Sequence, residues 1–398
     1  MRPLPLVALT VLTATLASSC AERKETPPTG PTLSLTRVSF TDLPGWPDDD
    51  PSEALSAFQR SCGRWAKQAA DKSVGGERSL AGTVADWRPA CAAAAVTPAT
   101  ATAARGFFET AFSPFAVSDG TKPDGLFTGY YEPRLQGSHV RDGRYRYPLY
   151  RRPADLVSVD LGQFDPELQG RRVAGRVEAG RLVPYADRAA IDRGALAGRD
   201  LELLWVDDPI DRFFLEIQGS GQIEMPDGGI TRVGYADQNG RPYRAIGKDL
   251  IEIGAIPREQ VSMQAIRAWL EANPSRAPAM MARNGSYVFF RETPEQADAP
   301  GPVGAQGVPL TPGRSLAVDR KFLPLGAPLW LDTVAPYPDG ERPLRRIVIA
   351  QDTGGAIRGP VRGDVFWGAG PEAAAIAGRM KSPGRMFILL PYERTPTS

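Results

Sequence analysis

Histidine and cysteine are scarce in this chain, and their scarcity excludes a class of site. The 398 residues include one histidine, His139, and three cysteines, Cys20, Cys62 and Cys91. A zinc site usually needs three or four imidazole or thiolate ligands gathered in one place, and one histidine with widely spaced cysteines cannot supply them. We therefore expect neither a metal nor another cofactor.

An excess of charge of one sign is also missing. Lys and Arg together number 47 and Asp and Glu 46, so the net charge with His139 neutral is +1. Proteins that bind nucleic acids usually carry a basic patch or stripe, which this composition does not indicate. A nucleic-acid partner is therefore not expected.

Long apolar runs are absent apart from one at the N-terminus. Arg2 is followed by a largely apolar run over residues 4–16, which is shorter than the roughly 20 residues that span a bilayer and is typical of an export signal. The run leads into Leu-Ala-Ser-Ser-Cys, ending at Cys20, which resembles a bacterial lipobox. Residues 1–20 are thus predicted to be a lipoprotein signal with a lipid on Cys20. The alternative is an ordinary signal cleaved near Ser19, which leaves an odd thiol.

The segment after Cys20 indicates where the protein resides. Ala21 at this position favours the outer membrane, so we expect a protein anchored to the periplasmic face of that membrane. Residues 21–36 are polar and rich in proline, as in a flexible tether. In an oxidising periplasm Cys62 and Cys91 could pair as a disulfide worth roughly 3 to 4 kcal/mol. Two buried free thiols are the alternative.

Proline and glycine are abundant and indicate the fold class. Pro accounts for 38 of the 398 residues, nearly twice the usual ~5%, and Gly for 41. This composition predicts a mainly β fold with short strands and many turns, and the length predicts two domains. Strands are predicted at 128–131, 145–150, 181–185, 201–206, 212–217, 287–290, 315–318, 328–331, 346–350, 365–367 and 386–390. Helices are predicted at 51–62, 97–108, 245–253, 262–270 and 371–380.

Two adjacent tyrosines follow a glycine at 128–133, TGYYEP. Gly129 allows a ligand or backbone to approach closely, and the faces of Tyr130 and Tyr131 could cover sugar rings while their hydroxyls form hydrogen bonds. Successive residues of a strand point to opposite faces, so at most one of the two tyrosines should face a ligand. The alternative is that both pack in the core.

A Gly-Ser-Gly turn is predicted to follow the strand at 212–217. Its amide, hydroxyl and backbone groups could bind a polar ligand. The spacing is not that of a phosphate loop, so nucleotide binding is not expected. A tight hairpin without a ligand is the alternative. The candidate contacts are Gln218, Gly219, Ser220 and Gly221, with Tyr235 and Lys248 as weaker candidates of the same kind.

Aspartates stand beside short apolar runs near the C-terminus. Asp352 and Asp364 lie in glycine-rich turns, and ionised side chains are seldom buried without a partner, so the pair predicts an acid site. Cleavage of a glycosidic bond requires a proton on the leaving oxygen, which a carboxylic acid with a raised pKa can donate. Residues 365–367 give Asp364 apolar surroundings, whereas Asp352 could bind the amides of its own turn.

Five blocks of the sequence carry a resemblance to a known family. They are TGYYEP at 128–133, EIQGSG at 216–221, YRAIGKDLIEIG at 243–254 with SMQAIRAWL at 262–270, SYVFF at 286–290, and DR-x₃-P-x-G from Asp319 followed by DTGGAI at 352–357 and DVFWG at 364–368. Together they resemble the membrane-bound lytic murein transglycosylase A family, murein-cleaving lipoproteins whose C-terminal 3D domain is named for three aspartates. The resemblance covers roughly residues 128–391.

The resemblance implies a fold and a reaction. The fold is a double-psi β-barrel catalytic domain formed by residues 37–133 and 296–398, with a β-rich substrate-binding domain inserted at 134–295 and a groove between them. The reaction is cleavage of the β-1,4 bond between N-acetylmuramic acid and N-acetylglucosamine of peptidoglycan, with formation of a 1,6-anhydromuramic end. Asp364 is expected to act first as acid and then as base.

Other roles and partners follow from the same resemblance. The family's three aspartates correspond to Asp319, Asp352 and Asp364. Asp352 is a candidate second catalytic residue that could stabilise the positive charge on the sugar, for which a backbone dipole or the sugar's own acetamido group are the alternatives. Asp319 is expected to contact the substrate. The implied partners are peptidoglycan glycan strands, the outer membrane through the lipid anchor, and a complex for cell-wall synthesis or hydrolysis.

Two other functions are weighed against this one. Asp352-Thr353-Gly354 is the triplet of aspartic proteases, but such a site needs two carboxylates that share a proton, and the chain has one triplet. A non-catalytic lipoprotein that only holds peptidoglycan could use the same aromatic residues, but it would leave Asp364 without a task. Analysis of the reaction products separates the three.

Overall fold

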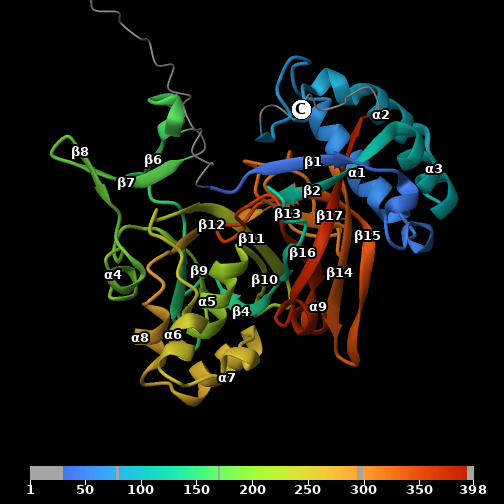
Figure 1. The fold of residues 1–398 in the computed structure, drawn as a ribbon. Coiled ribbons are helices and arrows are strands. Elements are labelled where there is room, and N and C mark those ends of the chain that lie inside the picture. The colour runs from blue at the N-terminus through green and yellow to red at the C-terminus, as the bar shows by residue number, and fades with distance from the viewer. Residues whose placement is uncertain (1–29, 78–79, 169–170, 294–298, 392–398) are drawn as a thin grey trace, which may run out of the picture.

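The computed structural model describes residues 30–77, 80–168, 171–293 and 299–391, which form two large β-sheets, a small third sheet and surrounding helices (Figure 1). The largest sheet consists of β1 (Leu33–Arg37), β2 (Phe112–Asp119), β3 (Gly125–Glu132), β13 (Ser315–Val318), β14 (Pro328–Tyr337), β15 (Gly340–Asp352), β16 (Arg362–Ala369) and β17 (Lys381–Pro391). Its strand order is β1-β2-β17-β14-β15-β13-β16-β3, and β17 also pairs with β3. The strands from β17 to β3 therefore close into a six-stranded barrel.

Parallel pairs within the barrel join segments that are far apart in the sequence. β3 runs parallel to β16, and β13 runs parallel to β15, whereas β14 is antiparallel to both β15 and β17. A closed six-stranded barrel with such crossings agrees with the predicted double-psi arrangement. The predicted fold class, mainly β with a second β-rich lobe, is confirmed.

A second lobe is built around another mainly antiparallel sheet. Its strands are β4 (Arg134–Ser138), β5 (Tyr147–Tyr150), β9 (Glu202–Val206), β10 (Ser220–Glu224), β11 (Ile230–Gln238) and β12 (Val288–Thr293). Their order is β12-β11-β10-β4-β9-β5, and a bridge between Arg151 and Phe290 brings the two outer strands together. Alternating apolar residues such as Leu135, Leu204 and Ile223 fill the core of this lobe.

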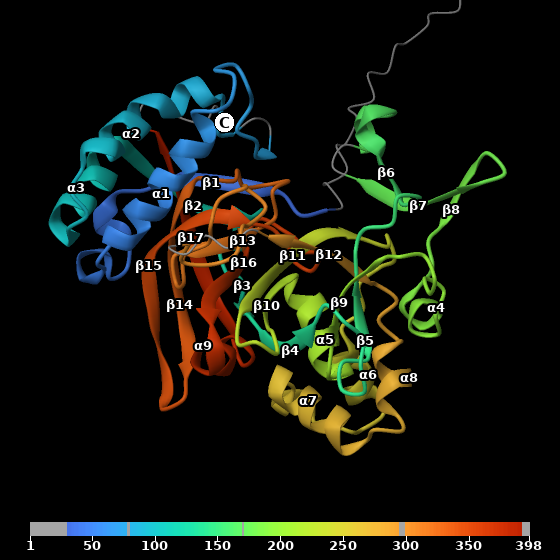
Figure 2. The same cartoon turned by 180° about the vertical axis from the view of Figure 1, so that it is seen from behind.

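A three-stranded sheet projects from the second lobe and is called the arm below (Figures 1 and 2). It comprises β6 (Val157–Asp160), β7 (Arg172–Glu178) and β8 (Arg181–Pro184), in the order β6-β7-β8. The two-residue turn between β7 and β8 places Ala179 and Gly180 at positive φ, 48° and 76°, as the turns of tight hairpins require.

Helices cover the outside of both lobes. They are α1 (Ser52–Trp65), α2 (Val84–Val96), α3 (Ala101–Ala111), α4 (Arg188–Asp192), α5 (Pro209–Gln218), α6 (Ile246–Glu252), α7 (Met263–Ala272), α8 (Ala277–Met281) and α9 (Gly370–Ala377). Short 3₁₀ turns occur at Phe40–Asp42, Trp46–Asp48, Leu161–Gln163, Pro166–Leu168 and Arg258–Gln260. None of the helices in the described ranges has the length and apolarity needed to cross a bilayer.

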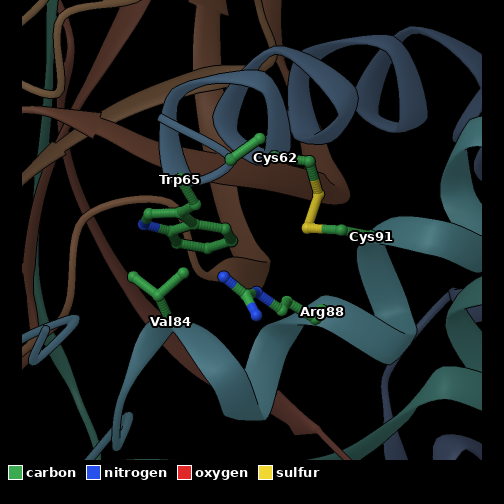
Figure 3. Close-up of a pocket in the computed structure, with 6 residues that line it drawn as sticks. Cys62, Trp65, Val84, Arg88 and Cys91 are labelled. Carbon is green, nitrogen blue, oxygen red and sulfur yellow. A yellow bond between two sulfur atoms is a disulfide. The ribbon is translucent and has the colours of Figure 1, made fainter. Parts of the chain in front are cut away.

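The first three helices pack together on the barrel (Figure 1). On α1 the apolar residues Leu55, Phe58 and Cys62 recur at helical spacing and are buried. Cys62 forms a disulfide with Cys91 of α2, with their Cα atoms 5.4 Å apart. Beside the disulfide, Trp65 and Arg88 line a small pocket (Figure 3).

The barrel passes directly into the second lobe at Pro133, the single residue between β3 and β4. Glu132, at the end of β3, is 1% exposed, accepts a hydrogen bond from Gln222 Nε2 at 3.0 Å, and lies 3.2 Å from Arg232 Nε. Arg134 in turn donates to Gln222 Oε1 at 2.9 Å. The residues before and after Pro133 are thus both bound to strand β10 of the second lobe, and Glu132 also to β11, which restricts movement at the junction.

Two predictions of local structure are wrong. Residues 212–217 belong to helix α5 and not to a strand, because Asp208 caps the N-terminus and Pro209 occupies the first turn. The helix expected from Thr97 instead begins after Thr100, whose side chain accepts from the Ala103 amide. Thr97 ends the preceding helix α2.

The predicted tether at 21–36 is shorter at its C-terminal end, because β1 already begins at Leu33 and pairs with β2. The predicted export signal and Cys20 lie outside the described residues.

Candidate active site

Asp364 lies in β16, directly opposite Thr128 of β3 in the barrel register. The Thr128 hydroxyl donates a hydrogen bond to Asp364 Oδ1 at 2.6 Å. Arg362 Nη2 donates to the same hydroxyl oxygen at 2.9 Å. Within the described parts of the chain, Asp364 Oδ2 receives no hydrogen bond. One carboxylate oxygen is therefore fixed and the other is left for a ligand.

Burial is the largest influence on the acidity of Asp364 and raises its pKa to about 6. The hydrogen bond from Thr128 and the positive charge of Arg362 lower this pKa, while the charge of Asp352 raises it. A carboxyl group with a pKa near 6 is protonated in a substantial fraction of molecules close to neutral pH. Asp364 is thereby suited to general acid catalysis.

Asp352 ends β15 and is held by three donors. Its Oδ1 accepts the Ala305 amide at 2.9 Å, and its Oδ2 accepts the Tyr130 hydroxyl at 2.9 Å. The backbone amide of Thr353 also binds the carboxylate. Burial raises the pKa of Asp352, and the three hydrogen bonds oppose that rise. With both oxygens engaged, Asp352 is better suited to provide a fixed charge than to transfer a proton.

The Tyr130 hydroxyl donates its hydrogen bond to Asp352 and holds its proton over the whole ordinary pH range. Burial, followed by the charge of Asp352 and the hydrogen bond to it, raises the pKa of Tyr130 well above its ordinary value. The charge of Asp364 raises the Tyr130 pKa further. The tyrosine ring packs against Phe366, with the ring centroids 5.3 Å apart, so Tyr130 links β3 to the strand that carries Asp364.

Behind Asp352, the buried side chain of Gln351 ties the end of β15 to helix α1. Its Nε2 donates to the Ala57 carbonyl at 2.9 Å and to Ser61 Oγ at 3.0 Å. Its Oε1 accepts from Ser315 Oγ at 2.6 Å. A buried amide whose donors and acceptor are all paired fixes the backbone that carries it.

The loop that binds Asp352 is attached to the same helix. Ser61 Oγ donates to Gln306 Oε1 at 2.8 Å, and the Gln306 amide donates to the Gln351 carbonyl at 3.0 Å. Ala305, whose amide holds Asp352, immediately precedes Gln306. Helix α1 therefore supports both Asp352 and the loop that binds it.

Asp319 follows β13 and has backbone partners. Its Oδ1 accepts the Lys321 amide at 3.1 Å, and its Oδ2 accepts the Gly359 amide at 2.9 Å. The residue is 8% exposed. Asp319 thus connects the end of β13 to the loop that follows Asp352, and these contacts give it a role in shaping that loop.

The two adjacent tyrosines point to opposite faces of β3. Tyr130 turns toward Asp352, whereas Tyr131 packs with Ala373 and Ala377 of α9. Gly129 is required for packing within the protein, because a Cβ there would lie 2.7 Å from Trp367 Nε1 and 2.8 Å from Ala377 Cα. The close approach expected at Gly129 is therefore made by α9 and Trp367.

The predicted turn at 218–221 has a different geometry. Gln218 is the last residue of α5, and Gly219 caps the helix with φ of 81°, which favours glycine. Ser220 and Gly221 begin β10, and a Cβ on Gly221 would lie 2.4 Å from Leu215 Cδ1. The motif joins a helix to a strand and is not a hairpin. Gly219 serves to cap the helix, and Gly221 allows close packing against Leu215.

Gln218 nevertheless contacts the candidate site strand. Its Oε1 accepts the Tyr131 amide at 3.2 Å. The end of α5 in the second lobe is therefore connected to β3 of the barrel, next to the residue that binds Asp352.

A groove lies where the second lobe meets the loop after Asp352. Tyr243, Arg244 and Lys248 from around the start of α6 and Ala356 from that loop line a hollow of about 390 Å³. Burial raises the pKa of Tyr243, and the negative charge of Asp364 adds to the rise, so the two side chains are close enough to interact electrostatically. The predicted residue Lys248 is exposed here.

Tyr235 lies in β11, at an irregularity in the pairing with β12. Its side chain is 41% exposed, and burial of the hydroxyl with the nearby charge of Asp237 raises the pKa of Tyr235 to about 12. No hydrogen bond of its hydroxyl is present in the described parts of the chain.

Arg362 is the main component that sequence reasoning missed. A signal for it was available, because residues two apart in a strand share a face, and Arg362 precedes Asp364 by two. The Ala305 amide could not have been found in this way, because backbone donors leave no trace in a residue pattern. In the described ranges, no cluster of three or more His, Cys, Asp or Glu side chains is arranged to hold a metal ion.

Comparison with known proteins finds matches over both lobes. A family model described as the MltA specific insert domain matches residues 126–291, and one described as the 3D domain matches residues 314–390. The membrane-bound lytic murein transglycosylase A of Escherichia coli strain K12 is 36% identical over 270 residues, which are 66% of this chain and 65% of that protein. The protein of the same name from Vibrio cholerae is 34% identical over 278 residues, 68% of this chain and 67% of that one.

Solved structures extend the similarity over most of the chain. A membrane-bound lytic murein transglycosylase from Agrobacterium tumefaciens has a TM-score of 0.78 and 37% identity, covering 90% of this chain and 98% of that one. MltA from Neisseria gonorrhoeae has a TM-score of 0.75 and 36% identity, covering 92% and 94%. Escherichia coli MltA with bound chitohexaose has a TM-score of 0.63 and 27% identity, covering 91% and 93%.

Proposed function

Because the chain belongs to the membrane-bound lytic murein transglycosylase A family, we propose that it cleaves peptidoglycan. The bond broken is the β-1,4 link between N-acetylmuramic acid and N-acetylglucosamine, and the product carries a 1,6-anhydromuramic end. The observation that carries the proposal is the carboxyl group of Asp364, whose pKa is raised to about 6 and whose Oδ2 is left for a ligand.

Asp364 supplies the acid and then the base. Protonated Asp364 gives its proton to the leaving glycosidic oxygen as the bond to C1 breaks. The resulting carboxylate takes the proton of the C6 hydroxyl as that oxygen closes on C1, so that no water is consumed. Since Thr128 occupies Oδ1, the proton is carried on Oδ2. One carboxyl group suffices, whereas glycoside hydrolases commonly use a pair about 5 to 9.5 Å apart.

Asp352 acts through its charge. Its two oxygens already accept the Ala305 amide and the Tyr130 hydroxyl, so it is a poor proton carrier but a fixed negative centre. That charge raises the pKa of Asp364 and favours the positive charge that develops on the sugar ring. Asp319 supports the loop that follows Asp352.

The glycan strand is proposed to lie in the groove between the lobes. The Escherichia coli relative that binds chitohexaose supports a sugar polymer as the ligand. We assign residues 37–133 and 296–398 to the catalytic domain and 134–295 to the substrate-binding domain. The membership of the two large sheets supports this division, except that β1 of the barrel sheet already begins at Leu33. Of the predicted substrate contacts, Gln218, Ser220, Tyr235 and Lys248 are retained in this proposal, and Tyr243 is added because it lines the groove. The other predicted contacts have roles within the protein and are not proposed to touch the glycan: Gly129, Tyr131, Gly219 and Gly221 serve packing or capping, Tyr130 binds Asp352, and Asp319 supports the loop after Asp352.

The protein is proposed to be lipid-anchored at Cys20 on the periplasmic face of the outer membrane. The names of the relatives describe them as membrane-bound, and the lipobox-like sequence supports a lipid as the means. Partners in a cell-wall synthesis or hydrolysis complex remain part of this proposal.

Mass spectrometry of the muropeptides released from purified sacculi tests the function. The soluble chain, residues 21–398, should release products lighter by one water than the hydrolytic ones. The Asp364→Asn variant should release them on the order of 10³-fold more slowly, while Asp124→Asn, at an exposed position, should match the unmodified protein. Hydrolytic products would sink the mechanism with one carboxyl group. No release by folded protein would favour a lipoprotein that only binds peptidoglycan.

A further inference from the structure

The arm has one apolar face and one polar face. Cross-strand pairs place Val157 opposite Gly175 and Val159 opposite Val173, and Val177 opposite Leu182. Paired residues point to the same side of a sheet, and residues two apart on one strand share that side. The apolar face consists of Val157, Val159, Val173, Gly175, Val177, Leu182 and Pro184.

The polar face is the one that meets the body of the protein. Ala174 packs against the second lobe so closely that a Cβ on Gly240 would lie 2.8 Å from the Ala174 Cβ. Arg172, on the same face, donates to Asp237 Oδ1 at 2.9 Å. The apolar face therefore points away from the body, the reverse of the usual arrangement in which a sheet buries its apolar side.

The outward face is exposed as well as apolar. Val177 is 59% exposed, Leu182 41%, Val173 40% and Val157 36%. None of these four side chains belongs to a hydrophobic core cluster of the described residues. Phe164, in the connection from β6 to β7, is 77% exposed. A contiguous exposed patch of this kind usually marks a surface that another body covers.

We propose that the apolar face of the arm rests on the surface of a phospholipid bilayer. Ten residue steps separate Cys20 from Gly30, the first described residue, and a fully extended chain of that length reaches roughly 35 Å. With a lipid on Cys20, the start of β1 is thus held within roughly 35 Å of the membrane. Both views show the chain entering β1 from the side on which the arm projects (Figures 1 and 2).

Other occupants fit the face less well. A stable dimer usually buries about 800 Å² per partner from some 20 to 30 residues, far more than the few side chains of this face provide. The segments that remain outside the described residues after export are also unsuitable, because residues 21–29, 294–298 and 392–398 contain a single aromatic residue and no Val, Leu, Ile or Met. They are too polar to cover an aliphatic surface.

Charge does not drive this contact. Residues 157–184 contain four basic and four acidic side chains, so the arm has no net charge. Insertion of aliphatic side chains among the lipid headgroups must supply the attraction, as it does for the apolar faces of interfacial segments. The arm should therefore bind neutral and anionic bilayers similarly, with little dependence on salt.

Flotation with lipid vesicles tests the proposal without relying on the anchor. The soluble chain, residues 21–398, contains every described residue and would be mixed with vesicles of phosphatidylcholine or of phosphatidylethanolamine and phosphatidylglycerol. The test variant combines Val177→Asp with Leu182→Lys, which keeps the net charge and places opposite charges across the hairpin. A second variant carries Thr at both positions. The matched control combines Val96→Asp with Val140→Lys, at positions that are 82% and 69% exposed outside the arm.

We expect the unmodified chain and the control to float with both kinds of vesicle. Both arm variants should lose at least about tenfold in partition coefficient, while their release of muropeptides from isolated sacculi stays unchanged. Absence of vesicle binding by the unmodified chain would overturn the proposal. So would binding that persists in both arm variants, or a concentration-dependent dimer that the arm variants abolish, since the occupant would then be a second copy.

The arm proposal and the proposed function fail separately. If the chain floats with vesicles but releases no muropeptides, the membrane contact of the arm is supported and the proposed enzymatic function is contradicted.

Discussion

The two aspartates of the barrel have the same functional group but different surroundings. Asp364 accepts one side-chain hydrogen bond, from Thr128, whereas Asp352 accepts the Ala305 amide, the Tyr130 hydroxyl and the Thr353 amide. Burial raises the pKa of both. On the proposed mechanism, the number of donors distinguishes the carboxyl group that releases and recovers a proton from the one that only provides charge.

Replacing each aspartate by asparagine breaks the comparison most directly. Asp364→Asn removes the transferable proton and should lower kcat on the order of 10³-fold. Asp352→Asn removes charge but no proton transfer, and should lower kcat on the order of tenfold. Muropeptide release under single-turnover conditions measures both. Equal losses at the two positions would show that the donors do not divide the roles.

Replacing Gln351, which fixes the backbone next to Asp352, tests whether Asp352 and Asp364 are held independently of each other. Gln351→Leu removes the acceptor of the buried Ser315 hydroxyl and the side-chain donor to the Ala57 carbonyl, and should cost about 1 to 3 kcal/mol in the free energy of unfolding. Urea denaturation measures this loss, with Gln260→Leu at an exposed position as the control. The pH at which activity declines should stay near that of the unmodified protein, because Asp364 keeps its own partner. A large shift of that pH would argue against separate supports.

Removing the hydroxyl of Thr128 tests how far one hydrogen bond controls the pKa of Asp364. The Thr128 hydroxyl stabilises the charged carboxylate, so Thr128→Val should raise the pKa of Asp364 further above 6. The protonated acid then persists to higher pH, and the alkaline decline of kcat should move up by about one pH unit. Thr128→Ser keeps a hydroxyl and should leave the profile in place. A downward shift in the valine variant would contradict the assignment.

Stability should also depend on pH through Asp364. Its folded pKa of about 6 exceeds the ordinary value of 3.8, so the folded state binds the proton more tightly than the unfolded state. Folding stability therefore falls as the pH rises from about 4 to about 6 and does not recover above that. Asp364→Asn removes this penalty and should add about 3 kcal/mol at pH 7.5, with little effect at pH 4. Chemical denaturation at the two pH values provides the measurement, and an equal effect at both would exclude linkage to this residue.

Most strands were predictable from alternating or short apolar runs, but one such run was misleading. Phe213, Phe214 and Leu215 are all buried, and a short continuous apolar segment is compatible with a strand or with a buried helix. The Asp208-Pro209 pair before it was the signal that favours a helix. Helix α2 was missed although Thr83 and Asp86 form a capping box, because Pro89 lies inside the helix.

The aspartates of the site could be found from the sequence, but their partners could not. Thr128 and Asp364 are 236 residues apart and meet because β3 and β16 pair in the barrel. Local patterns contain no information about such long-range pairing, and only the family resemblance supplied the barrel. Arg362 was within reach of strand periodicity, whereas the Ala305 amide depends on the path of a loop.

The junction at Pro133 has a mechanical consequence. With one residue between β3 and β4, and with Glu132 braced by Gln222 and Arg232, the two lobes have little freedom to swing about this connection. The width of the groove between the two lobes is therefore expected to stay nearly constant. If the proposed function holds, a groove of constant width need not open to admit a glycan strand, and lobe opening is not expected to limit the rate of cleavage.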